Sequence, residues 1–111
     1  MMIKMIINKI KKLLGISTST ETDYRTLVAG GAQIIDVRTP AEFSAGHIPN
    51  SINIPLTLLG KRILRVGKDK PIILCCASGM RSATAKSTLV SMGYRDVHNG
   101  GSWSRLMNEI E

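Results

Sequence analysis

Cys76 ends an apolar run and is followed after a short loop by an arginine. The run from Pro71 to Cys76 has the pattern of a buried strand. Residues 77–80 form a connection short enough to curl its backbone N–H groups around the Cys76 sulfur. A helix beginning near Arg81 would add its positive end and a guanidinium at the same place. These features predict a reactive thiolate at Cys76 in an anion-binding loop.

The residues predicted to cradle the sulfur are Ala77, Ser78, Gly79, Met80 and Arg81. Gly79 permits a positive φ, Ser78 adds a hydroxyl donor and Arg81 adds a permanent charge. Cys75 is predicted to be a small core side chain, because successive residues of a strand point to opposite faces of a sheet.

From Thr20 onward, helix and strand patterns alternate. The predicted strands cover residues 33–38, 51–54, 71–75 and 96–98, and the predicted helices cover residues 22–30, 39–46, 56–66, 82–92 and 103–110. Strands separated by helices imply parallel pairing and right-handed crossovers. We expect an α/β domain with a central parallel sheet of about five strands and helices on both faces. Ligands of such sheets bind at the carboxyl ends of the strands, where Cys76 lies.

Two charged residues lie near the end of the first predicted strand, at the same edge of the sheet as Cys76. Asp36 is expected to accept hydrogen bonds from the loops that frame the site. Arg38 is expected to pair with Glu42 across one helical turn, and Thr39 and Pro40 are predicted to begin that turn.

The segment from Cys76 to Ser82 resembles the active-site loop of rhodanese-family sulfurtransferases, whose pattern is Cys-x-Ser-Gly-x-Arg-Ser. Further segments match in the family's order: residues 35–43 are similar to its first signature, residues 46–55 to the segment that follows, and residues 99–103 to its Gly-Gly and Trp ending. Trp103 follows the Gly-Gly pair sooner than in many relatives, which is expected to change how the last helix packs. The resemblance covers residues from about 20 to 110.

The resemblance implies a rhodanese-like fold and a thiosulfate sulfurtransferase that needs no cofactor. The Cys76 thiolate would take sulfane sulfur from thiosulfate or a persulfide donor and pass it to a thiol or to cyanide. Asp36, Arg38 and Ser82 are expected to support the loop, and His47 is expected to brace a neighbouring loop. An alternative is a binding module that carries sulfur from a donor protein to a partner, or that senses redox state through Cys75 and Cys76.

A second enzymatic interpretation comes from counting the loop from Cys75. Five residues separate Cys75 from Arg81, the spacing of cysteine phosphatases and arsenate reductases, whereas four separate Cys76 from Arg81. The phosphatase pattern prefers a histidine before its cysteine, and Leu74 occupies that position here. The two interpretations differ in which sulfur lies at the centre of the loop.

Residues 1–19 are predicted to form a basic amphipathic helix and a linker, and residues 20–111 to form the rhodanese-like domain. The apolar residues of the first segment recur at three- and four-residue intervals, and its lysines lie between them. The segment is too short to cross a bilayer, and it lacks a signal-peptide cleavage site. Two interpretations remain: docking on this domain or a partner, and contact of residues 1–14 with an anionic membrane surface.

The composition narrows the classes of function. The chain has 111 residues and a net charge of +7, enough for one domain. Its four aromatic residues offer no stacking platform, so we expect no nucleic-acid partner. No metal site is expected, because both histidines lie far from the cysteines. The expected partners are small sulfur-containing anions and thiols, or a protein that donates or accepts sulfur. Adjacent cysteines make no ordinary disulfide framework, which favours a cytoplasmic location.

Overall fold

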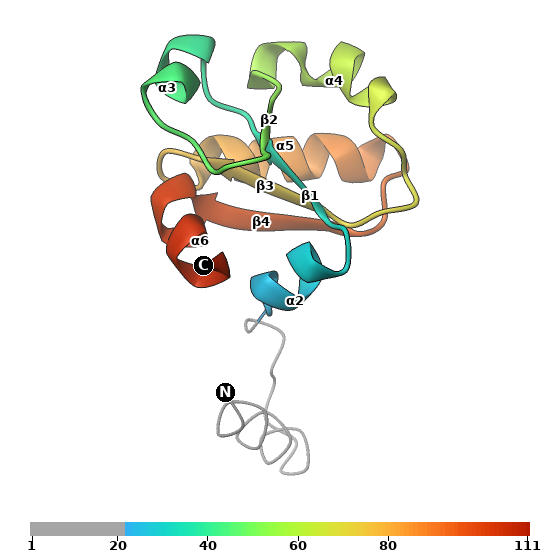
Figure 1. The fold of residues 1–111 in the computed structure, drawn as a ribbon. Coiled ribbons are helices and arrows are strands. Elements are labelled where there is room, and N and C mark those ends of the chain that lie inside the picture. Colours follow the sequence, from blue (N-terminus) through green and yellow to red (C-terminus); the bar gives the residue numbers. More distant parts are fainter. Residues whose placement is uncertain (1–21) are drawn as a thin grey trace.

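The computed structural model describes residues 22–111 of the chain (Figure 1). The helix predicted before residue 15 and the domain boundary predicted at residues 19 and 20 lie outside the described residues. The strands are β1 (Gln33–Asp36), β2 (Ile52–Asn53), β3 (Ile72–Cys76) and β4 (Val97–Ser102). The α-helices are α2 (Tyr24–Ala29), α3 (Pro40–Ala45), α4 (Leu59–Arg62), α5 (Met80–Ser91) and α6 (Trp103–Ile110), and two short 3-10 helices, η1 (Leu56–Leu58) and η2 (Ile63–Arg65), flank α4.

The strands form one parallel sheet in the order β2-β1-β3-β4. The α/β class and the parallel pairing are therefore confirmed. The sheet has four strands within the described residues, where about five were expected. β3 lies between β1 and β4, so both of its edges are paired and all five of its residues are buried. This central place explains the unbroken apolar run before Cys76.

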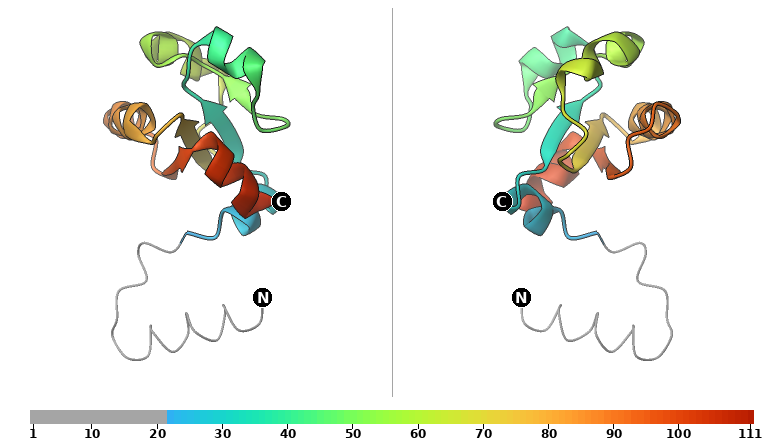
Figure 2. Two further views of the ribbon diagram at one scale, coloured as in Figure 1. Left: turned by 90° about the vertical axis from the view of Figure 1, so that its left-hand side faces the viewer. Right: turned by 90° about the vertical axis from the view of Figure 1, so that its right-hand side faces the viewer.

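Helices cover both faces of the sheet, as the sequence predicts (Figure 2). On one face, Leu59, Ile63 and Leu89 from the α4 and α5 segments pack on alternate residues of β1 and β3. On the other face, Leu106 of α6 and side chains of α2 pack on Ile34 and Ile73. Two apolar cores therefore lie back to back across the sheet. Among the described residues, no helix has the length and apolar character needed to cross a bilayer.

Local sequence sets the ends of the helices that flank the site. Thr39 caps α3, Pro40 stands at its first position, and the Glu42 side chain completes a capping box, which confirms the predicted start. The helix predicted over residues 56–66 is instead divided into η1, α4 and η2. Helix α5 begins at Met80, two residues before the predicted start, because Gly79 takes a left-handed conformation with φ of 100°.

A β-bulge in β4 shapes the edge of the sheet beside Cys76. Leu74 pairs with Asn99 and Cys75 pairs with Gly101, so Gly100 is the extra residue. A Cβ atom on Gly100 would lie 2.9 Å from side-chain atoms of both Ile73 and Leu106, so only glycine fits there. Bulges of this kind redirect the side chains next to them, and here the neighbour is Asn99.

Candidate active site

Cys76 is the last residue of β3, and the chain leaves it through an exposed connection that enters α5 at Met80. Its side chain lies on the α5 face of the sheet and packs into the core beneath that helix. The Cys76 side chain has 0 % exposure. The sulfur therefore lies beneath the loop, at the carboxyl end of the central strand and beside the N-terminus of α5.

The loop directs hydrogen-bond donors at this sulfur. The Gly79 backbone N–H donates to the Cys76 Sγ over 2.9 Å, and the Ser82 Oγ lies 3.5 Å from it. Burial by itself raises the pKa of Cys76, but the Ser82 hydroxyl and the backbone N–H groups of Ser82, Gly79 and Ser78 outweigh it, so the pKa lies below its ordinary value. The arrangement favours a thiolate, which is the form that acts as a nucleophile.

Asn99 supports this loop, a role that its place in the sequence does not predict. Its Oδ1 accepts from the Ser82 hydroxyl at 2.6 Å and from the Gly101 N–H at 3.0 Å. Its Nδ2 donates to the Gly79 carbonyl at 3.2 Å. Asn99 thereby joins β4 to the loop and to the first turn of α5. The only signal in the sequence was its place beside the Gly-Gly pair, where the resemblance drew attention to the glycines.

The Ser82 hydroxyl carries one proton and has three possible hydrogen-bond partners. Its oxygen lies 2.6 Å from Asn99 Oδ1, 3.1 Å from the Gly79 carbonyl oxygen and 3.5 Å from the Cys76 sulfur. The contact with Asn99 Oδ1 is the shortest of the three, so Asn99 and Cys76 compete for the single Ser82 proton. The backbone N–H groups of the loop are therefore the donors permanently available to an anionic sulfur, and Ser82 contacts the sulfur directly instead of merely supporting the loop.

Cys75 has the opposite environment. Its side chain packs on the other face of the sheet with Ile34, Ile73 and Leu106. Burial and the nearby Asp36 carboxylate raise the pKa of Cys75 to about 12. Cys75 is therefore a neutral core thiol at physiological pH, and Cys76 is the cysteine at the centre of the loop. This geometry favours the four-residue spacing over the phosphatase spacing.

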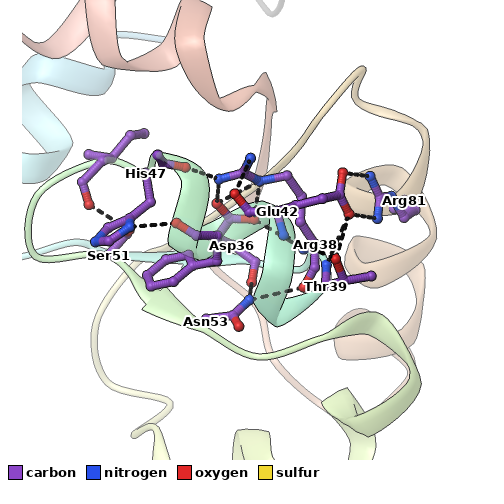
Figure 3. Close-up of polar contacts among 11 residues, drawn as sticks. Asp36, Arg38, Thr39, Glu42, His47, Ser51, Asn53 and Arg81 are labelled. Carbon is purple, nitrogen blue, oxygen red and sulfur yellow. Dashed lines mark hydrogen bonds and ion pairs between the residues drawn. The ribbon is translucent and has the colours of Figure 1, made fainter.

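Asp36 and Arg38 form a buried ion pair with each other. The Arg38 Nη2 lies 2.7 Å from Asp36 Oδ2, and the Arg38 Nε and backbone N–H also donate to the same carboxylate (Figure 3). Asp36 thus takes its side-chain hydrogen bonds from Arg38, which lies in the connection between β1 and α3. Arg38 also donates to the carbonyls of Glu42 and Gly46 and lies 4.6 Å from the Trp103 ring centroid. The pair joins β1, α3 and α6.

The expected pairing of Arg38 with the Glu42 side chain is wrong. Arg38 reaches only the backbone carbonyl of Glu42, because its guanidinium is already engaged by Asp36. The Glu42 carboxylate instead pairs with Arg81 at 2.7 Å and 2.9 Å (Figure 3). The guanidinium of Arg81 is therefore occupied by Glu42, whereas the sequence analysis counted it among the groups that stabilise the thiolate.

His47 lies where the sequence analysis placed it, as a brace. Its ring stacks on Phe43 with centroids 3.7 Å apart, and its Nδ1 lies 2.8 Å from the Phe43 carbonyl oxygen. Trp103 begins α6 and packs against Gly46 as well as Arg38. These contacts fix the turn after α3 and position the last helix against it.

The basic residues that follow β2 lie outside this site. Lys61, Arg62, Arg65, Lys68 and Lys70 are all exposed. A pocket of about 350 Å³ is lined by Arg62 and Arg65 together with residues of β1 and β2, and by none of the loop residues. Within residues 22–111, no group of three His, Cys, Asp or Glu side chains is placed to hold a metal ion.

Comparisons with known proteins find relatives over most of the described domain. The family model described as "Rhodanese-like domain" matches residues 20–106. The uncharacterized protein YqhL of Bacillus subtilis is 43 % identical over 84 residues, which are 74 % of this chain and 64 % of that protein. The thiosulfate sulfurtransferase PspE of Escherichia coli is 39 % identical over 69 residues, 60 % of this chain and 66 % of that protein. The chain thus spans slightly less than two thirds of the length of these two relatives.

A solved structure supports the same relationship. The structure described as "rhodanese with anions from E. coli" aligns with a TM-score of 0.63 and 34 % sequence identity, covering 67 % of this chain and 89 % of that chain. The alignment therefore includes almost all of the E. coli protein.

Proposed function

Because this chain belongs to the rhodanese-like domain family, we propose that it transfers sulfane sulfur through a persulfide on Cys76. Relatives from several bacteria are named sulfurtransferases, and some are named thiosulfate sulfurtransferases. The observation that carries the proposal is the Cys76 sulfur beneath a loop whose Gly79 N–H donates to it over 2.9 Å. A sulfur anion in this position is stabilised without any cofactor.

The reaction consists of two displacements at sulfur. The Cys76 thiolate attacks the outer sulfur of thiosulfate and forms a new S–S bond, and sulfite leaves with the electron pair of the bond that breaks. Cys76 remains as a persulfide, whose negative charge lies on the outer sulfur. A thiolate or cyanide then attacks the outer sulfur of the persulfide, and the Cys76 thiolate leaves.

The loop must move for the donor to arrive, because the Cys76 side chain has 0 % exposure. Ala77, Ser78 and Met80 are exposed and Gly79 is partly exposed, so the loop that covers the Cys76 sulfur is itself in contact with solvent. The backbone N–H groups of Ser78 and Gly79 lower the pKa of the thiol. In the persulfide, the same groups would donate hydrogen bonds to the outer sulfur, which carries the negative charge.

Mass spectrometry of the intact protein tests this proposal. Incubation with thiosulfate should add one sulfur atom, and cyanide should then remove it as thiocyanate with turnover. Cys76→Ser should abolish both steps, and Cys75→Ser should retain most of the activity because Cys75 lies on the opposite face of the sheet. Loss of activity in Cys75→Ser with retention in Cys76→Ser would overturn the assignment and favour the phosphatase interpretation, in which the loop is counted from Cys75.

A further inference from the structure

The guanidinium of Arg81 is held by Glu42 at the edge of the loop. Two nitrogens of Arg81 donate to the two carboxylate oxygens of Glu42, at 2.7 Å and 2.9 Å (Figure 3). This fork-to-fork geometry is also the one by which arginine binds an anionic ligand. Glu42 therefore occupies the hydrogen-bonding face that Arg81 would otherwise offer to an incoming anion.

Glu42 is fixed in place independently of Arg81. Its Oε1 accepts from the backbone N–H and from the hydroxyl of Thr39, both at 3.1 Å, as part of the capping box of α3. The hydrogen bond from Arg81 and those from Thr39 lower the pKa of Glu42 to about 2. The carboxylate is therefore ionised and correctly positioned throughout the pH range in which the protein would work.

The pair is close enough to the site to affect an anion and exposed enough to open. Arg81 lies in the first turn of α5, and the pKa of its guanidinium is raised chiefly by the hydrogen bond to Glu42 and further by a negative charge on Cys76. The side chains of Arg81 and Glu42 are each 36 % exposed. Although the contact is bidentate, solvent and salt screen a pair that is this exposed, so an anionic donor can compete with Glu42 for the guanidinium. Arg38 cannot take this role, because Asp36 holds it in the interior.

We propose that Glu42 sets the charge preference of the Cys76 site by occupying Arg81. The carboxylate makes a dianionic donor such as thiosulfate bind less well, relative to a donor with less negative charge. Glu42 is thus a specificity-determining residue that acts through Arg81. This inference rests on the proposed sulfur transfer for its choice of donors, although its physical basis is the ion pair alone.

Glu42→Gln tests the proposal, because a glutamine at this position keeps one oxygen for the capping box and loses the charge and the second acceptor that hold Arg81. Glu109→Gln is the matched control: Glu109 pairs with Arg105 on α6, is exposed, and loses the same charge away from the loop. Two donors that break the same type of S–S bond should be compared, the dianion thiosulfate and the monoanion benzenethiosulfonate.

In Glu42→Gln, we expect kcat/KM for thiosulfate to rise about two- to fivefold at low salt through a lower KM, the size expected for release of an exposed ion pair. The gain should be smaller for benzenethiosulfonate, should disappear at high salt, and should be absent when Arg81→Gln is also present. Glu109→Gln should leave kcat/KM unchanged for both donors. An unchanged ratio between the two donors, or an equal loss for both, would show that Glu42 only supports the loop and would overturn the proposal.

A second measurement separates this inference from the proposed function. In a Cys75→Ser background, the rate of Cys76 alkylation should be measured with anionic iodoacetate and with neutral iodoacetamide. Glu42→Gln should raise the rate with iodoacetate relative to the rate with iodoacetamide about two- to fivefold, whether or not the protein transfers sulfur. If thiosulfate adds no sulfur to the unsubstituted protein, the proposed function fails, and the alkylation ratio still decides the role of Glu42. An unchanged ratio would refute that role even in an active sulfurtransferase.

Discussion

Cys75 and Cys76 are neighbours in the chain and occupy two different kinds of environment. Cys76 faces α5 at the carboxyl end of β3 and receives the Gly79 N–H. Cys75 faces the opposite core, near the buried pair of Asp36 and Arg38. The alternation of a strand separates the two thiols, and the loop that follows stabilises an anion at only one of them. Position on the sheet, not residue type, thus sets the opposite pKa shifts of the two cysteines.

The comparison also separates two kinds of polar network. On the Cys75 side, Arg38 joins β1, α3 and α6 through a carboxylate, two carbonyls and the ring of Trp103. On the Cys76 side, Asn99 joins β4 to the loop and to α5. We expect changes to the first network to alter stability alone, and changes to the second to alter both stability and the reactivity of Cys76.

The largest expected effect is the loss of stability in Asp36→Asn. This change leaves the Arg38 charge buried without its carboxylate, which should lower the free energy of unfolding by about 3–5 kcal/mol in urea denaturation. Adding Arg38→Met should recover part of the loss, because the uncompensated charge is then removed. The pH dependence of Cys76 alkylation should be unchanged in folded Asp36→Asn. A loss below about 1 kcal/mol would mean that the pair contributes no more than an exposed ion pair.

A smaller effect, confined to the other network, is expected for Asn99→Ala. Ser82, Gly79 and Gly101 lose their partner, which should cost about 1–3 kcal/mol of stability. The loop geometry should loosen as well, so that Cys76 takes sulfur from thiosulfate about tenfold more slowly.

Asn53→Ala provides the matched control for Asn99→Ala. Asn53 donates to the carbonyls of Asp36 and Arg38, both at 3.0 Å, and it lies between β2 and β1, away from the loop. We expect a similar loss of stability and an unchanged rate of sulfur loading. Equal slowing in both variants would show that the rate follows global stability, and Asn99 would then have no particular role in positioning the loop.

The sequence predicts the features of this molecule that depend on neighbouring residues. The apolar run before Cys76, the glycine at position 79 and the capping signal at Thr39 each specify local structure, and the parallel α/β sheet follows from their alternation. The partners that the sequence missed lie far apart in the chain. Asn99 meets Ser82 and Gly79 across 17 and 20 positions, and Arg81 meets Glu42 across 39 positions. In the sequence, Glu42 is equally well placed to pair with the nearby Arg38, and only the fold shows which arginine it binds.

The smallest expected effect is a difference in how the two thiols link stability to pH. The pKa of Cys75 is raised to about 12 in the folded protein and lies near 8.5 in the unfolded chain. Its contribution to stability is therefore complete below pH 8.5 and is lost between about pH 8.5 and 12, at up to about 1.4 kcal/mol per pH unit. The pKa of Cys76 is lowered, so its contribution is complete above about pH 8.5 and is lost as the pH falls through the folded value.

Urea denaturation at pH 8 and pH 10 measures this difference. Cys75→Ser removes the thiol with the raised pKa, so its free energy of unfolding should fall less between the two pH values than that of the unsubstituted protein, by about 1–2 kcal/mol. Only the change with pH is compared, because a buried hydroxyl also costs stability at every pH. Cys76→Ser needs a second pair of measurements below pH 8.5, at about pH 6 and pH 8, where its free energy of unfolding should rise less with pH than that of the unsubstituted protein. Equal pH dependence in the three proteins would mean that both thiols have ordinary pKa values, and the contrast between the two faces of β3 would then be one of packing alone.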